Sequence, residues 1–429
     1  MDQRTLTPED TSAPSEEVTK PSVFSPRRYA MFESMQYRDF RWMVAGSFVS
    51  FLAMNMQMIT RAWLVLRLTD DSPVALAWVM ASFSLPMTLV SPLGGALADR
   101  LPRKYLVIIS QTGNAVMTII IGLLDFTGAV QFWHVLVIGF INGSLMTFNM
   151  PSRQAMLSEV VPEKSLMNAI SLNNSGMNLT RIVGPAVAGF MIVFVGTHGV
   201  FFTVGAIYVF SVISTMMVDA GKTPASSSRK SVGGDIVEGL KYASGDRARL
   251  GVIILVLVTT LFGFSYYALL PAWAREALNV GSEDLGGLMG IMGVGALVGT
   301  LGLAAAPNVK RRGLWLIGSA FLWGVSLALF SQVTNYGVSI PFLLVIGAIS
   351  SVSMSLTMTM MQVLAAPEMR GRMMSIAMMT FGAMPLSSVP FGLLAEYTGT
   401  PDSLMISGIL LAVITLLFGV FYPGFRRVD

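Results

Sequence analysis

The chain has 429 residues, of which 53% are hydrophobic and only 12% are charged, about half of the roughly 25% typical of a soluble domain. This composition excludes a water-soluble globular protein, and the absence of cysteine excludes disulfides, thiolate zinc sites and thiol catalysis. The net charge of +4 comes from short basic clusters between apolar runs, which argues against nucleic-acid binding, and with only two histidines we expect no metal site.

An N-terminal polar segment precedes the apolar part of the chain. Residues 1–35 are rich in Ser, Thr, Pro and Glu and lack the apolar core of a signal peptide, so we expect a disordered cytoplasmic tail. Beyond it, apolar runs long enough to cross a bilayer, about 20 residues each, alternate with short charged loops. The twelve predicted spans are 41–66, 74–97, 104–124, 132–150, 166–194, 199–218, 251–272, 285–306, 313–331, 338–361, 373–395 and 403–422.

The longest internal polar stretch, residues 219–250, follows the sixth span and divides the chain into six spans plus six. We predict a cytoplasmic linker there, with room for an amphipathic surface helix, between an N-terminal lobe over 36–218 and a C-terminal lobe over 251–422. Residues 423–429 form a cytoplasmic C-terminal tail. The halves repeat weakly at an offset of roughly 205 to 210 residues, which predicts an all-α membrane protein of two six-helix, pseudo-symmetric lobes.

Positive charge orients the predicted spans. With the N-terminus inside, each cytoplasmic segment carries Lys or Arg, whereas the outer loops hold only Arg67 and Arg275. An even number of spans places both termini on one side, so we expect both in the cytoplasm, in a multi-pass protein of the inner (plasma) membrane. The lipid bilayer is therefore the main expected partner, and we expect a monomer.

The loop after the second predicted span reads G-A-L-A-D-R-L-P-R-K over residues 95–104. It resembles the signature of that loop in the major facilitator superfamily, G-x-L-a-D-R-x-G-R-K, although Pro102 stands where the second glycine is usual. The resemblance implies a conformational latch in which Asp99 faces the start of the eleventh span and Arg103 pairs with Glu159. The candidate gating and latch residues are Gly95, Asp99, Arg100, Arg103, Lys104, Arg153, Glu159, Gly184, Pro185, Arg370 and Arg372.

Further segments narrow the resemblance, which runs over about residues 36–422. The runs P-S-R-Q-A and N-L-T-R-I-V-G-P-A-V-A-G are similar to the branch that includes the enterobactin exporter and related drug or lysophospholipid transporters. The Gly184-Pro185 step is similar to the kinked fifth helix of superfamily antiporters, although Thr180 replaces the first glycine of that pattern. Together these segments imply the major facilitator fold and favour antiport.

Charges inside the predicted spans are the best pointer to function, because ionisable groups there are costly and usually face the bundle interior. Arg181 lies roughly 15 residues into the fifth span, near mid-bilayer, and indicates a substrate or gating role, or else a structural role at helix-end carbonyls. Arg61 lies nearer the outer end of the first span and is long enough to snorkel. Asp125 and Glu396 lie near span ends, and the central parts of the predicted spans hold no Asp or Glu, so no proton site is evident.

The other polar side chains within spans predict a substrate cavity with polar walls, although any one of them is more often a helix-to-helix hydrogen bond. Methionine is abundant, with 31 residues, and its flexible thioethers suit either packing or a surface for varied apolar ligands. The candidate cavity residues are Asn55, Arg61, Asn142, Asn149, Asn178, Arg181, Tyr266, Tyr267, Met358 and Gln362.

We predict a secondary transporter, not an enzyme, that exports a small amphipathic molecule such as a drug or siderophore by alternating access. A buried cation with few buried acids favours an anionic or neutral substrate. The chain has no phosphate-binding G-x-x-x-x-G-K-[ST] loop, so we expect no cofactor and a proton gradient as the energy source. Two alternatives remain: an importer or flippase of a nutrient or lysophospholipid on the same fold, and a non-transporting membrane receptor or scaffold.

Overall fold

The fold is a bundle of long helices. The computed structural model describes residues 32–90, 102–219, 241–305, 310–366 and 383–428, together with Met369, Met373, Ile376 and Thr380. Within these residues every regular element is a helix. The N-terminal half contains η1 (Glu33–Gln36), α2 (Arg38–Leu68), α3 (Pro73–Leu89), α5 (Arg103–Phe126), α6 (Phe132–Val160) and α7 (Glu163–Met216). The C-terminal half contains α9 (Arg247–Val258), η2 (Thr259–Gly263), α10 (Ser265–Leu278), α11 (Ser282–Ala304), α12 (Arg312–Ser331), α13 (Tyr336–Val363), α15 (Met384–Thr398), α16 (Thr400–Phe421) and η4 (Phe425–Arg427).

In the described part of the chain, nine helical stretches are long and apolar enough to cross a membrane. The longest, α7, has 54 residues and bends at Gly196, whose φ of 66° is the left-handed conformation that glycine adopts without a steric penalty. This bend separates the predicted fifth and sixth spans. With α7 counted as two spans, and the shorter α3 and α15 added, the helices are consistent with the twelve that the hydropathy predicts. The inner ends of the second and eleventh predicted spans lie outside the described residues.

Local signals in the sequence fix several helix starts. Ser72 precedes Pro73 and accepts a hydrogen bond from the backbone N–H of Ala75, so a polar cap and a proline begin α3. Asn335 caps α13 in the same way, through Val338 N at 3.2 Å. These caps satisfy backbone donors that would otherwise lie unpaired at the ends of apolar helices.

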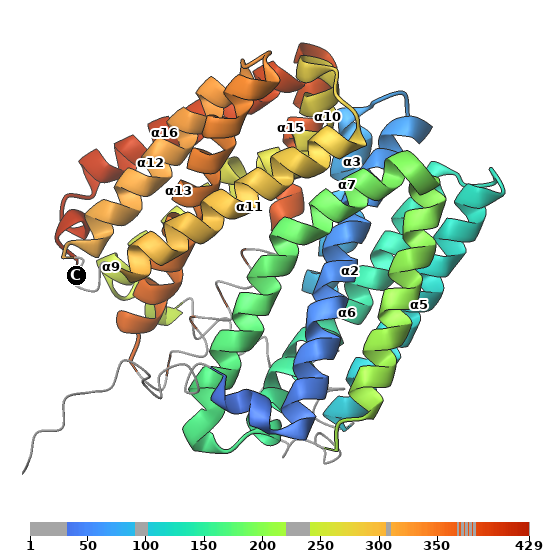
Figure 1. Ribbon diagram of the computed structural model, residues 1–429. Helices are drawn as coiled ribbons and strands as arrows, with labels where there is room; N and C mark the ends of the chain where they lie inside the picture. Colours follow the sequence, from blue (N-terminus) through green and yellow to red (C-terminus); the bar gives the residue numbers. More distant parts are fainter. Residues whose placement is uncertain are drawn as a thin grey trace, which may run out of the picture.

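The helices form two lobes, with α2 to α7 in one and α9 to α16 in the other (Figure 1). We call these the N lobe and the C lobe. The lobes approach each other near α3, α10 and α15, and their ribbons diverge toward the opposite end of the molecule. Following the orientation predicted from positive charge, we call the end where the lobes meet the outer end. The inner end is the one where α5 begins and α6 ends.

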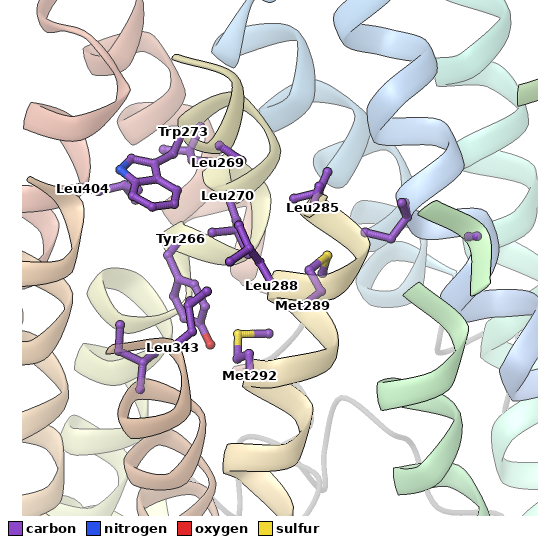
Figure 2. Packing of buried hydrophobic residues seen from close by; sticks show 14 of the residues in the cluster. Tyr266, Leu269, Leu270, Trp273, Leu285, Leu288, Met289, Met292, Leu343 and Leu404 are labelled. Atoms are coloured by element: carbon purple, nitrogen blue, oxygen red, sulfur yellow. The ribbon is translucent and has the colours of Figure 1, made fainter. Parts of the chain in front are cut away.

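The core of the C lobe is apolar and aromatic. Figure 2 shows Tyr266, Leu270 and Trp273 of α10 packed against Leu288, Met289 and Met292 of α11, with Leu343 and Leu404 beside them. The indole of Trp273 has a polar partner, since its Nε1 donates to the carbonyl of Ser331 at 2.8 Å. The cluster continues into the N lobe through Ala188 and Ile192 of α7.

Candidate transport pathway between the lobes

At the outer end the two lobes touch through glycines. A Cβ added at Gly286 of α11 would lie 2.6 Å from the carbonyl oxygen of Pro185 in α7, closer than real side chains allow. A Cβ added at Gly189 would lie 3.1 Å from the Cα of Gly286 and would clash with the carbonyl oxygen of Ser282. The backbones of α7 and α11 can therefore meet only because both positions lack a side chain. Ser282 Oγ also donates to the carbonyl of Gly189 at 3.3 Å.

Polar contacts close the same end. Arg275 Nη1 of α10 lies 2.6 Å from Asp71 Oδ1 beyond the end of α2, and its guanidinium lies 4.7 Å from the centre of the Trp63 ring. Ser72 Oγ donates to Glu396 Oε2 of α15 at 3.0 Å. Each of these contacts joins one lobe to the other. Sequence reasoning missed them as a latch, although Arg275 was already conspicuous as one of two basic residues in the predicted outer loops.

At the inner end the predicted ion pair is confirmed: Arg103 Nη1 lies 2.5 Å from Glu159 Oε1. Lys104, predicted to belong to the latch, is buried, and its Nζ donates to the carbonyls of Met216 and Val218 at the end of α7. A lysine at a helix C-terminus satisfies carbonyls that have no partner within the helix. These contacts lie within the N lobe. The other predicted latch residues, Gly95, Asp99, Arg100, Arg370 and Arg372, lie outside the described residues.

Arg181 lies between the lobes, as the mid-span position predicts. It is exposed on α7 and interacts electrostatically with Tyr267 of α10, which belongs to the C lobe. Its neighbour Ile182 packs against Gly293 of α11, where an added Cβ would lie 2.7 Å from Ile182 Cγ1. Arg181 is therefore beside the closed contact and on the side that faces the C lobe.

The predicted cavity residues separate into two groups. Asn178 is exposed on α7, and Gln362 is exposed on α13, where Met358 is half-buried. Tyr266 is instead buried in the C-lobe core, with its ring centre 5.7 Å from that of Tyr267. Tyr266 is therefore not available to the space between the lobes.

Asn55 and Gly184 serve packing within the N lobe. Asn55 Nδ2 donates to the carbonyl of Phe51 at 2.8 Å and to Thr180 Oγ1 at 3.4 Å, so it bridges α2 to α7. A Cβ at Gly184 would lie 2.7 Å from Asn55 Cβ, which places this glycine against α2. Pro185, one residue later, meets the other lobe through its carbonyl. The Gly184-Pro185 step thus joins the packing of the N lobe to the contact between the lobes.

Arg61, Asn142, Asn149 and Arg153 are buried inside the N lobe. Arg61, which the sequence left able to snorkel outward, is only 6% exposed. Arg153, predicted to be a gating or latch residue, is only 5% exposed, and its Nη1 donates to Ser47 Oγ at 2.7 Å. Sequence periodicity could not reveal this burial, because it depends on how α2, α6 and α7 pack.

One acidic side chain is buried among the described residues. Asp125, at the outer end of α5, accepts hydrogen bonds from Arg67 at the end of α2 and from Thr197 just after the bend in α7. Its side chain is only 1% exposed. The cluster ties three helices of one lobe together, and in the described part of the chain no group of three or more His, Cys, Asp or Glu residues could hold a metal.

The fold is shared with solved transporters. The chain resembles the crystal structure of a mutant of the nucleoside transporter NupG, with a TM-score of 0.75 at 12% identity, over 90% of this chain and 100% of that one. It also resembles a bacterial homologue of the human lysosomal transporter Spinster in an inward-facing, unoccupied conformation, with a TM-score of 0.71 at 13% identity, over 95% and 100% of the two chains. At these identities the likeness establishes the fold alone.

Sequence comparison establishes the family. Residues 29–423 match the profile of the family described as "Transmembrane secretion effector", and the chain belongs to this family of the major facilitator superfamily. It is 26% identical over 383 residues to the staphyloferrin A transporter of Staphylococcus aureus, which covers 88% of this chain and 95% of that protein. It is 25% identical over 380 residues to the multidrug efflux pump Tap of Mycolicibacterium fortuitum (86% and 91%) and 26% identical over 387 residues to macrolide efflux protein A of Streptococcus pyogenes (87% and 93%). The chain is thus a multi-pass plasma-membrane transporter protein and not an enzyme.

Proposed function

We propose that this protein is an alternating-access exporter that moves a small amphipathic molecule with an acidic group out of the cell, in exchange for protons. The observation that carries the proposal is the position of Arg181: it is exposed on α7, beside Tyr267 of the other lobe, just below a closed outer end. A cation held there faces a substrate that enters from the inner end.

The two lobes differ in a way that suits an amphipathic molecule. Among the described residues, Arg181 is the arginine that lies far from the ends of a predicted span, and it belongs to the N lobe. The C-lobe side chain beside Arg181 is the uncharged aromatic Tyr267 of α10, whereas the leucines and methionines shown in Figure 2 are buried. An acidic group would therefore bind toward the N lobe, and an apolar body toward the C lobe.

Export is favoured by the relatives that are named as efflux pumps, and alternating access by the contacts themselves. At the outer end the lobes touch through two close-packed glycines, a solvent-exposed ion pair and apolar contacts such as those of Ala188, so separating them there exposes a limited apolar surface. Proton coupling would run through Asp99, Glu159, Asp125, Glu396 or the substrate itself.

Transport by everted membrane vesicles tests the proposal. A panel of dyes, siderophores and lysophospholipids is offered to the vesicles with and without a proton gradient. The vesicles contain the wild-type chain, Arg181→Gln, or the matched control Arg247→Gln, which changes an exposed arginine of the C lobe. We expect gradient-dependent uptake of acidic substrates, which Arg181→Gln reduces about tenfold or more and Arg247→Gln leaves unchanged. Uptake only into right-side-out vesicles would instead establish the importer, and equal transport of acidic substrates by Arg181→Gln would refute its role.

A further inference from the structure

A turn of π-helix interrupts the first span of the C lobe. The segment η2 (Thr259–Gly263) joins α9 to α10 within one continuous helical stretch, Arg247–Leu278. Such turns are rare inside α-helices and are frequent at functional sites. This one is held by another helix, because Ser407 Oγ of α16 donates to the carbonyl of Phe262 at 2.6 Å. Tertiary contacts therefore fix the widened turn in place.

The indole of Trp323, from α12, packs against this turn. A Cβ added at Gly263 would lie 2.9 Å from Trp323 Cη2, and the centre of the Phe264 ring lies 5.1 Å from that of the indole, at a near-perpendicular angle. Trp323 is only 1% exposed, yet its Nε1 has no hydrogen-bond partner among the described residues. Because an indole N–H is a donor only and buried polar groups are normally paired, Trp323 calls for an acceptor.

A second unpartnered group borders the same space. Thr260 Oγ1 of the π-turn is buried and has no hydrogen-bond partner in the described part of the chain. Thr260 and Trp323 both line one cavity of about 10 Å³, together with the hydroxyl side chains of Ser353 and Thr357 on α13. No charged side chain belongs to its described lining. A cavity of this volume holds about one water-sized group, so it suits a single neutral oxygen and neither an anion nor a ring.

The exposed edge of this cavity faces the N lobe. Phe264 and Met354 are the half-buried residues of its wall, whereas the other lining residues are buried. Phe264 lies eleven residues, or about three helical turns, before Arg275, and therefore on nearly the same side of the helix. Arg275 contacts Asp71 of the N lobe. The edge at Phe264 therefore faces the space between the lobes, roughly 16 Å inward of that ion pair.

This direction places the cavity within reach of a molecule bound at Arg181. Tyr267, which interacts electrostatically with Arg181, lies three residues after Phe264, about one turn away. A molecule whose acidic group is bound at Arg181 would meet Phe264 and Met354 with its apolar body. The thioether of Met354 is flexible and can move aside to admit one polar atom.

We propose that the cavity beside the π-turn binds a neutral acceptor oxygen, a carbonyl at the apolar end of the transported molecule, through Trp323 Nε1 and Thr260 Oγ1. The proposal rests on the proposed function and adds a specificity determinant in the C lobe to the acid-binding role of Arg181. A site built to hydrogen-bond an oxygen rejects an analogue that lacks it, because the buried donors are then left unpaired.

The test compares two probes of nearly equal shape, 4-acetylbenzoate and 4-isopropylbenzoate, in which a methyl group replaces the carbonyl oxygen. A third probe, acetophenone, carries the carbonyl without the acid. Calorimetric titration of the full-length chain in lipid nanodiscs gives each affinity, with the heat from empty nanodiscs subtracted. The variants are Trp323→Phe and Thr260→Val, which each remove one donor, and Thr260→Ser, which keeps the hydroxyl. The matched controls are Trp315→Phe and Thr127→Val, at exposed positions.

We expect the wild-type chain to bind 4-acetylbenzoate about tenfold more tightly than 4-isopropylbenzoate. Trp323→Phe and Thr260→Val should each reduce this ratio to about threefold or less, whereas Thr260→Ser and both controls should keep it. Where Trp323→Phe fails to yield folded protein, Thr260→Val and Thr260→Ser carry the test, because valine keeps the shape of threonine.

A spectroscopic measurement reports on the indole directly. In the chain labelled with ¹⁵N-tryptophan, the indole N–H resonance of Trp323 should move downfield on addition of 4-acetylbenzoate or acetophenone, but not of 4-isopropylbenzoate. Loss of one resonance in Trp323→Phe assigns it among the seven tryptophans.

Three results would overturn the proposal. Equal affinity for the two benzoates, or no saturable binding of 4-acetylbenzoate, would mean that water and not a carbonyl satisfies the two donors. A ratio that Trp323→Phe and Thr260→Val both leave unchanged would place the carbonyl elsewhere.

Acetophenone and the vesicle assay separate this proposal from the proposed function. A shift of the Trp323 resonance by acetophenone, alongside equal transport of acidic substrates by Arg181→Gln, would leave the cavity standing and refute the role of Arg181. Gradient-dependent uptake into everted vesicles, alongside equal affinity for the two benzoates, would refute the cavity and leave export standing.

Discussion

Replacing Gly189 by alanine should force the outer end open. The new Cβ would lie 3.1 Å from the Cα of Gly286 and deep inside the van der Waals surface of the Ser282 carbonyl oxygen, and both obstacles are backbone atoms that no rotamer change can move. Overpacking of this kind costs about 1 to 3 kcal/mol. Because the strain exists only when the lobes are closed at the outer end, the equilibrium should shift toward the open state by about 5- to 150-fold.

The absence of cysteine makes this shift measurable. Ala77 of α3 is fully buried where α3 packs against α15, at a second contact between the lobes. There, a Cβ added at Gly392 of α15 would lie 2.7 Å from the Cβ of Ala77. A single Ala77→Cys, labelled from outside by a membrane-impermeant maleimide, therefore reports movement of whole lobes and not a local change in α7. We expect the labelling rate to rise by a factor within the range of about 5 to 150 given above.

The matched control is Gly318→Ala in α12, where an added Cβ would have no heavy atom within 4 Å. It makes the same change in helix propensity without a clash, so labelling of Ala77→Cys should not change. Equal labelling in the wild-type and Gly189→Ala backgrounds would refute the conclusion that the glycine contact holds the lobes together. An equal rise in the Gly318→Ala background would show that the effect is not specific to the interface.

Three smaller effects follow from the other contacts. Arg275→Gln should raise the labelling rate of the same cysteine by no more than about fivefold. Its partner Asp71 is half-exposed, and ion pairs of this kind contribute about 0.2 to 1 kcal/mol. A larger rise at high salt than at low salt would contradict this. Asp125→Asn should lower the thermal unfolding midpoint, because it removes the buried carboxylate that accepts hydrogen bonds from Arg67 and Thr197, at a cost of about 1 to 3 kcal/mol. An unchanged midpoint would mean that these hydrogen bonds add no stability. Lys104→Met should cost about 1 kcal/mol in the same assay, because the carbonyls of Met216 and Val218 lose a donor, and it should leave the labelling rate unchanged.

Hydropathy and charge predicted much of the fold, because a membrane span must be helical and about 20 residues long. The predicted span 104–124 is the helix Arg103–Phe126, and the predicted boundary between the fifth and sixth spans falls at the bend at Gly196. The family signature likewise predicted the pairing of Arg103 with Glu159. These features depend on runs of residues or on a motif, and neither requires knowledge of tertiary packing.

The contacts between lobes could not be predicted in this way. Arg275 and Asp71 are separated by 204 residues, and Gly189 and Gly286 are glycines like many others in an apolar chain. Nothing local marks which glycine meets a carbonyl of another helix. The contact of Gly189 with Gly286 can be recognised only when α7 and α11 are placed side by side.

Arg61 shows where reasoning from one helix stops. Near the outer end of α2, its side chain is long enough to reach the outer surface, and a single helix in a bilayer favours that direction because it hydrates the charge. Side-chain geometry on a helix favours the other direction, toward the start of α2, and only neighbouring helices that supply polar partners can make burial tolerable. Among the described residues the structure places Tyr208 near Arg61, but no buried acid. The burial of Arg61 therefore depends on the neighbouring helices and could not be predicted from α2 alone.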